Sequence, residues 1–137
     1  MTDIKVLVID DDRSYQILIT HMLSRGDVNY IVEYMPTYET GLEAIGKGEH
    51  QIYLIDYDLG QISGIQLMRE AMKKGLKAPV IMMTGQVREG VDMEAIKAGA
   101  TDYIDKADLK PTTLQRAIHY ALERDRVAKE RERHAEQ

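Results

Sequence analysis

The chain has 137 residues, of which 44% are hydrophobic, enough for one domain with its own core. The absence of cysteine excludes disulfides, thiolate catalysis and zinc-thiolate sites, and the net charge of −5 argues against a nucleic-acid partner, because phosphate binding needs a basic surface. The sequence shows neither an apolar stretch long enough for a bilayer nor a charged and then apolar leader, so we expect a cytoplasmic protein that does not bind membranes.

The first part of the chain alternates apolar runs with helical patterns. Ile4–Ile9 predicts a buried strand that ends in three aspartates, and the helix that follows stops at Gly26. Tyr30–Met35 is rich in strand-forming residues but carries Glu33, which predicts an exposed edge strand. Thr37 can cap the next helix.

The centre of the chain predicts two strands that are covered on both faces. The continuous apolar run 52–55 ends at Asp56, and the run 80–83 ends at Thr84. A short loop is expected after Asp56. Ser63, followed three residues later by a glutamine, indicates the start of another helix.

The last part of the chain completes the pattern. Residues 91–98 predict a helix stopped by Gly99, residues 103–104 a short strand that ends near Lys106, and Pro111 suits the first turn of a last helix. Five strands therefore alternate with five helices. This alternation predicts βαβ units, right-handed crossovers and a single α/β domain with a mostly parallel sheet.

Five polar residues fall at the carboxyl ends of the predicted strands: Asp10, Asp11, Asp56, Thr84 and Lys106. These ends share one edge of a parallel sheet, so we expect the five side chains to converge. Clustered carboxylates cannot all stay ionised without a cation, and oxygen-only ligands favour a hard ion such as Mg²⁺. A lysine and a hydroxyl opposite such an ion suit a phosphoryl group, and an aspartate can accept it as an aspartyl-phosphate. Asp56 is our candidate for the reacting group.

Four motifs of this sequence resemble those of response-regulator receiver domains of two-component signalling, over residues 5–122. They are Val-Leu-Val-Ile-Asp10-Asp11, Ile55-Asp56-Tyr57-Asp58-Leu59 with Gly64, Met83-Thr84-Gly85, and the run from Ala98 to Lys106. Each motif alone is a weak signal, but all four in order and at the family's spacing are a strong one. The resemblance implies a doubly wound (βα)5, flavodoxin-like sheet with strand order 2-1-3-4-5.

The resemblance also implies a metal site. Asp11, Asp56 and the backbone carbonyl of Asp58 would hold Mg²⁺ directly, and Asp10 would act through water.

The same resemblance implies a phosphorylation-dependent switch. Asp56 would accept a phosphoryl group from a histidine kinase or a histidine phosphotransfer protein, and Lys106 would pair with its oxygens. Thr84 would move towards the phosphoryl group, and Tyr103 would then turn inward. The chain would not be an enzyme beyond its own phosphorylation and hydrolysis at Asp56.

Two positions depart from the family pattern. Ala107 follows Lys106 where the family has a proline with a cis peptide bond, and a cis bond without proline costs roughly 2.5–4 kcal/mol, so we expect a trans bond and a slightly different approach of Lys106. Gly60 stands where the family favours proline, which leaves this loop freer.

Two alternative functions stay open. The first is a haloacid-dehalogenase-like phosphohydrolase, because Asp56-Tyr57-Asp58 resembles the Asp-x-Asp motif of that family. The acid pair upstream and the lack of room for a cap domain argue against it. The second is a receiver-like interaction module that is never phosphorylated.

The last predicted helix has an apolar face that suits docking on the sheet: Leu114, Ala117, Ile118, Ala121 and Leu122. After this face the sequence becomes mostly charged. We expect a receiver domain over residues 1–123 and a charged continuation over 124–137. A frayed tail is one interpretation. We favour a helix that continues as a linker or coiled-coil start, through which the domain pairs with its own copy or reaches a fused or separate output domain. Residues 116–124 resemble the exit helix of receivers fused ahead of other signalling domains.

Overall fold

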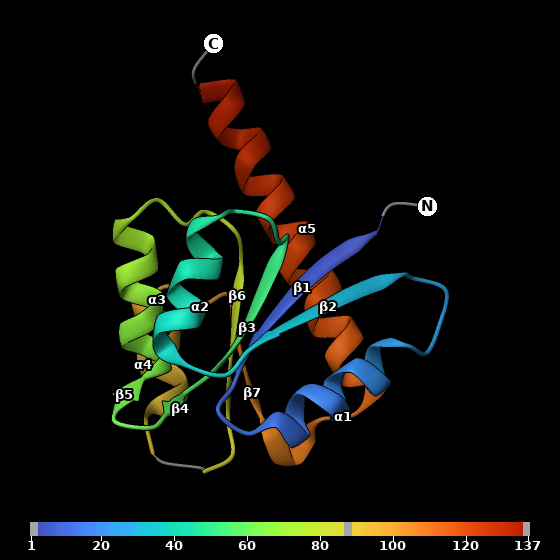
Figure 1. Cartoon of the computed structure of the whole chain (residues 1–137). Helices are drawn as coiled ribbons and strands as arrows, with labels where there is room; N and C mark the ends of the chain where they lie inside the picture. The colour runs from blue at the N-terminus through green and yellow to red at the C-terminus, as the bar shows by residue number, and fades with distance from the viewer. Residues whose placement is uncertain (1–2, 87–88, 136–137) are drawn as a thin grey trace.

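A five-stranded parallel sheet with helices on both faces forms the core of the computed structural model, which describes residues 3–86 and 89–135 (Figure 1). The sheet strands are β1 (Ile4–Ile9), β2 (Tyr30–Met35), β3 (Ile52–Asp56), β6 (Val80–Thr84) and β7 (Asp102–Asp105). The helices are α1 (Arg13–Leu23), α2 (Tyr38–Gly46), α3 (Gly64–Lys73), α4 (Val91–Ala98) and α5 (Pro111–Ala135), with a 3-10 turn η1 (Lys106–Asp108). The sheet order is β2-β1-β3-β6-β7. Because β6 and β7 are the fourth and fifth strands of this sheet along the chain, the order confirms the predicted 2-1-3-4-5 and the flavodoxin-like fold.

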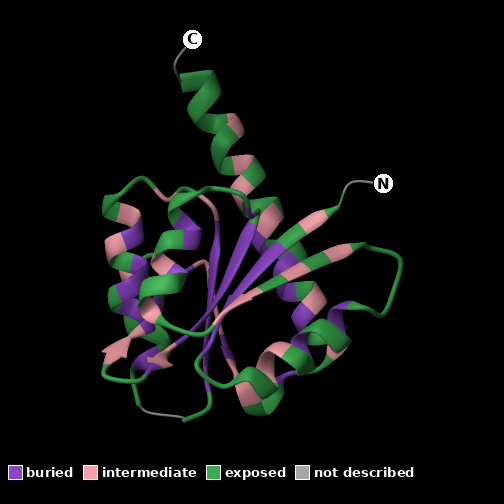
Figure 2. Cartoon of the chain, in the orientation of Figure 1, coloured by how far each residue is buried: buried purple, intermediate pink, exposed green. Residues whose placement is uncertain are grey.

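Alternate residues of the strands point to the two faces of the sheet and build two apolar layers. Val6 and Val8 of β1 pack in the layer that contains buried residues of α1 and α5, while Leu7 and Ile9 pack in the layer that contains those of α2, α3 and α4. Every residue of β3 and β6 is buried, as expected for strands covered on both faces (Figure 2). Strand β2 lies at the edge and alternates between partly buried and exposed residues, so the predicted edge strand is confirmed.

Side chains cap the starts of α1, α2 and α3, and the caps at Thr37 and Ser63 were predicted. Asp12 caps α1 by accepting from the Ser14 amide, and the Ser63 side chain accepts from the amide of Gln66 at the start of α3. Thr37 makes a complete capping box with Thr40 at α2.

The segment after Asp56 differs from the loop expected there. Asp58–Leu59 (β4) and Ile62–Ser63 (β5) form a small antiparallel hairpin, with Leu59 opposite Ile62. Gly60 begins its two-residue turn at a φ of +82°, a conformation that glycine adopts without a steric penalty. The glycine allows a regular turn here, and the expectation that it leaves this segment freer stays a prediction.

The last helix leaves the domain body. Its first half buries Leu114, Ala117, Ile118 and Ala121, and the helix then continues to Ala135 away from the sheet (Figure 1). Ion pairs along the helix support the second half, including Arg126 with Glu123 at 2.6 Å. The predicted helical continuation is confirmed, whereas the domain boundary at residue 123 stays a prediction. In the described part of the chain, no helix has the length and apolar character needed to cross a membrane.

Candidate phosphoryl-acceptor site

The parallel sheet brings the predicted polar residues to one edge. Asp10 follows β1 directly, Asp56 and Thr84 are the last residues of β3 and β6, and Lys106 follows β7. Asp10, Asp56 and Thr84 are buried, with exposed fractions of 0%, 3% and 1%. The convergence expected from the strand pattern is therefore present in the structure.

Three carboxylates and one ammonium group form the centre of this site. Asp10, Asp11 and Asp56 each offer an oxygen, and these oxygens lie within 4.8 Å of one another. The Lys106 Nζ atom lies 2.7 Å from Asp10 Oδ2 and 3.4 Å from Asp56 Oδ1. Apart from this ammonium, these two buried oxygens have no hydrogen-bond partner among the described residues. One lysine against three carboxylates leaves excess negative charge, which fits a divalent cation with oxygen ligands.

The protonation of Asp56 reflects its burial and this excess charge. Burial, together with the charge of Asp10, raises the pKa of Asp56 to about 7, and Lys106 and the Asp58 backbone offset only part of the increase. Burial alone would lower the pKa of Lys106. Its hydrogen bond to Asp10 and the nearby carboxylates outweigh that effect, so the pKa of Lys106 is raised and the side chain stays charged.

The two residues predicted to move on phosphorylation, Thr84 and Tyr103, have different surroundings. The buried Thr84 hydroxyl donates to the Gln86 carbonyl at 3.1 Å. Tyr103 is opposite Met82 in the strand register and packs, partly buried, against the layer that contains α2, α3 and α4. Burial and the charges of Asp105 and Asp92 raise the pKa of Tyr103. Asp58, whose backbone carbonyl is a predicted metal ligand, is the first residue of β4 and lies two residues after Asp56 in the chain.

The peptide bond after Lys106 agrees with the expectation from Ala107, since none of the described residues has a cis peptide bond. Lys106 opens the 3-10 turn η1, which the Asp105 side chain caps by accepting from the Ala107 amide at 2.9 Å. Even without the family's proline, this turn carries the lysine to the acidic cluster.

Two tyrosines support the site and were not predicted. The Tyr15 ring lies under Lys106, with Nζ 3.8 Å from the ring centroid, a cation–π contact that helps to hold the ammonium in place. The Tyr34 hydroxyl donates to the Asp10 backbone carbonyl at 2.7 Å. The sequence feature that could have pointed to Tyr15 was its position in the first helical turn after the acid pair. For Tyr34 the signal was its place near the carboxyl end of β2.

Gly64 fixes the segment behind Asp56. Its amide donates to the Tyr57 carbonyl at 2.7 Å, and a Cβ atom placed on it would lie 2.1 Å from the Asp56 carbonyl oxygen. Only glycine allows α3 to start this close to the end of β3.

Comparisons with known proteins agree with this geometry. The chain is 30% identical over 103 residues to the two-component response regulator PhoP of Pseudomonas aeruginosa, which covers 74% of this chain and 44% of PhoP. It is 29% identical over 124 residues to the chemotaxis protein CheY of Listeria monocytogenes, covering 88% and 97% of the two chains. The chain thus spans less than half of PhoP but nearly all of CheY.

Solved structures give the same result. A CheY-like receiver domain protein from Methanospirillum hungatei superposes with a TM-score of 0.80 at 25% identity, over 93% of this chain and 99% of that one. NtrX from Brucella abortus gives a TM-score of 0.83 at 26% identity, over 94% of this chain and 29% of its own. The profile of the response regulator receiver domain matches residues 6–119. This chain belongs to the response regulator receiver domain family.

Proposed function

We propose that this chain is a cytoplasmic signalling switch in which Asp56 accepts a phosphoryl group from a histidine kinase or a histidine phosphotransfer protein. The observation that carries the proposal is the buried Asp56 carboxylate, which lies 3.4 Å from the Lys106 ammonium and within 4.8 Å of carboxylate oxygens of Asp10 and Asp11. Membership of the receiver family and its sheet order favour this function over a haloacid-dehalogenase-like hydrolase.

The transfer follows from the chemistry of these groups. An Asp56 oxygen attacks the phosphorus atom of a phosphohistidine, the new O–P bond forms as the N–P bond breaks, and the histidine ring leaves. Lys106 pairs with the phosphoryl oxygens. Asp11, Asp56 and the Asp58 carbonyl would hold Mg²⁺, with Asp10 acting through water. When bound, Mg²⁺ neutralises charge on the carboxylates and the phosphoryl group.

The switch then uses the added charge, which is about −1.5 to −2 at neutral pH. The Thr84 hydroxyl leaves the Gln86 carbonyl, to which it now donates at 3.1 Å, and donates to a phosphoryl oxygen instead. Tyr103 turns inward after this movement and changes the surface next to α4 and α5.

Incubation with acetyl phosphate and Mg²⁺ should add one phosphoryl group, and intact mass spectrometry should detect it. Hydroxylamine should remove the group, because it cleaves acyl phosphates. Asp56→Asn and chelation of the metal should each abolish the addition, whereas the control Asp58→Asn should keep it, because only the backbone of Asp58 is needed. An equal yield in Asp56→Asn would show that Asp56 is not the acceptor. A stable wild-type protein that takes up nothing would support the interaction module that is never phosphorylated.

Magnesium should stabilise the fold, because it relieves repulsion among the clustered carboxylates. At a hundredfold excess over Kd, we expect a gain of about 2.7 kcal/mol, visible as a higher melting temperature. Asp11→Ala should remove most of this response, while Asp27→Ala, an exposed acid in the turn before β2, should not. A full response in Asp11→Ala would place the metal elsewhere.

We also infer that α5 transmits the state of the site, either to an output domain or to a second copy of the chain. The inference rests on the helical continuation to Ala135, which leaves the domain body and carries its own ion pairs. Light scattering before and after addition of beryllofluoride, on the chain and on a version ending at Glu123, should show association that depends on the extension if copies pair. If the full chain stays monomeric in both states, pairing through α5 is excluded, and the extension either reaches an output domain or is a charged tail without a signalling role.

A further inference from the structure

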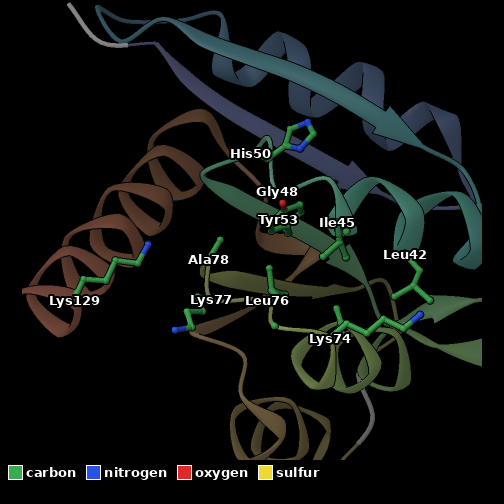
Figure 3. A pocket seen from close by; sticks show the side chains of 13 residues that line it. Leu42, Ile45, Gly48, His50, Tyr53, Lys74, Leu76, Lys77, Ala78 and Lys129 are labelled. Atoms are coloured by element: carbon green, nitrogen blue, oxygen red, sulfur yellow. The ribbon is translucent and has the colours of Figure 1, made fainter. Parts of the chain in front are cut away.

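A pocket of about 300 Å³ lies at the opposite end of the sheet from Asp56. It opens beside the first residues of β3 and β6, next to the carboxyl ends of α2 and α3 (Figure 3). Its apolar lining includes Leu42, Ile45, Leu76 and Ala78. This volume is at the lower limit of small-molecule sites in proteins.

Two buried polar atoms at this pocket have no partner. Among the described side chains, four buried nitrogen or oxygen atoms lack a hydrogen bond, and two of these are the oxygens of Asp10 and Asp56 beside Lys106. The other two are the Tyr53 hydroxyl and His50 Nδ1, and both residues line this pocket. Tyr53 is fully buried and His50 is 8% exposed, with their ring centroids 5.7 Å apart. A buried polar atom without a partner costs about 1–3 kcal/mol, so this pair calls for a ligand or water.

The chemistry of the two atoms is complementary. His50 Nε2 lies 2.7 Å from Glu33 Oε1, and because a carboxylate only accepts, Nε2 carries a hydrogen; in the tautomer with this single ring hydrogen, Nδ1 is an acceptor. Burial raises the pKa of Tyr53, and the nearby His50 backbone amide offsets only part of this, so the hydroxyl keeps its proton and needs an acceptor. A single hydroxyl group could accept from Tyr53 and donate to His50.

The charged residues that line the pocket are all cations: Lys74, Lys77 and Lys129. Lys74 also lies 3.8 Å from Glu70, and Lys129 lies 2.9 Å from Asp125, whereas no ion pair is recorded for Lys77 within the described ranges. The carboxylates of Glu70 and Asp125 offset the charges of Lys74 and Lys129, so Lys77 is the lysine of this set without an ion-pair partner among the described residues. Lys77 is therefore the cation at this pocket that is available to an anionic group of a ligand.

We propose that this pocket binds a small organic hydroxy acid, with its hydroxyl group at Tyr53 and His50 and its carboxylate among the three lysines. Lys129 belongs to the α5 extension, so such a ligand would tie the extension to the domain body. The proposal does not depend on phosphorylation of Asp56.

Backbone NMR of the full chain, titrated with 4-hydroxybenzoate and with 4-hydroxyphenylacetate, tests this site. At least one should give saturable shifts in the amides of residues 46–53 and 74–78. Benzoate lacks the hydroxyl and phenol lacks the carboxylate, and each should bind about fivefold more weakly or worse, as expected for one lost hydrogen bond or ion pair.

Matched variants locate the contacts. Tyr53→Phe should reduce the affinity for the hydroxy acid towards that for benzoate, with little change in the melting temperature, because the buried hydroxyl makes no well-formed hydrogen bond in the described part of the chain. The double variant Lys77→Gln, Lys129→Gln should weaken carboxylate binding, whereas Lys73→Gln, a lysine of α3 outside the pocket, should not. The absence of saturable shifts at these amides with both acids would mean that the pocket holds only water and would overturn the proposal. Unchanged affinity in Tyr53→Phe would also overturn it.

Discussion

Replacing Gly64 with alanine should destabilise the fold by about 3 kcal/mol or more and prevent phosphorylation of Asp56. The new Cβ atom would lie 2.1 Å from the Asp56 carbonyl oxygen and 3.0 Å from a methyl carbon of Ile55. The closest of these contacts is with the backbone of the central strand, which cannot rotate away as a long side chain can. The start of α3 or the end of β3 must move, and either movement displaces the acceptor.

Gly46→Ala is the matched control, because Gly46 also lies in a helical turn and a Cβ atom there would meet nothing within 4 Å. This change should leave stability unchanged or raise it by up to about 1 kcal/mol. Urea unfolding gives both values, and mass spectrometry after acetyl phosphate treatment gives the phosphorylation. A wild-type unfolding midpoint with full phosphorylation in Gly64→Ala would contradict the tight packing between α3 and β3.

Without metal, Asp56→Asn should make the protein more stable at pH 8 and should remove much of the decline in stability between about pH 4 and pH 7. The pKa of Asp56 is raised from 3.8 to about 7 in the folded protein, so the folded state binds a proton that the unfolded state has already lost in this range. Stability therefore falls as the pH rises through this window and levels off above it. The difference corresponds to at most about 4 kcal/mol, and asparagine does not carry the charge that causes it.

Urea unfolding in EDTA, from pH 4 to pH 8, measures this effect. Asp27→Asn, which changes an exposed acid, should keep the wild-type pH profile. Adding Mg²⁺ should bring the wild type closer to Asp56→Asn at pH 8, because the cation compensates the same charge. Parallel pH profiles for the wild type and Asp56→Asn would show that Lys106 alone neutralises the cluster.

Much of the fold follows from the apolar pattern. Runs such as 52–55 are long enough to mark buried strands, and strict alternation with helices fixes a parallel sheet, which in turn brings Asp10, Asp56, Thr84 and Lys106 to one edge. The hairpin at Asp58–Ser63 could not be predicted in the same way, because two-residue strands leave no periodicity to recognise.

Side-chain contacts between distant elements could not be predicted from the sequence either. The contact between Tyr15 and Lys106 depends on how α1 packs against α5, the helix that follows Lys106, and no spacing in the sequence predicts that packing. The pocket at His50 and Tyr53 likewise arises where two helix ends meet two strand starts. Each residue alone looks like an ordinary structural residue, and only the structure shows that the Tyr53 hydroxyl and His50 Nδ1 are both buried without a hydrogen bond to the described residues.

The extension of α5 has the shape of a lever arm. From Glu123 to Ala135 it comprises 13 residues, or about 20 Å of helix. At its base, the Arg124 side chain donates to the Thr101 carbonyl at 3.5 Å, just before the strand that holds Tyr103 and leads to Lys106. A tilt of about 10° at this pivot would swing the far end by roughly 3–4 Å, given the helical rise per residue. If the proposed transmission through α5 takes place, this geometry would convert a displacement of a fraction of an ångström beside β7 into a movement of several ångströms at the end of the helix.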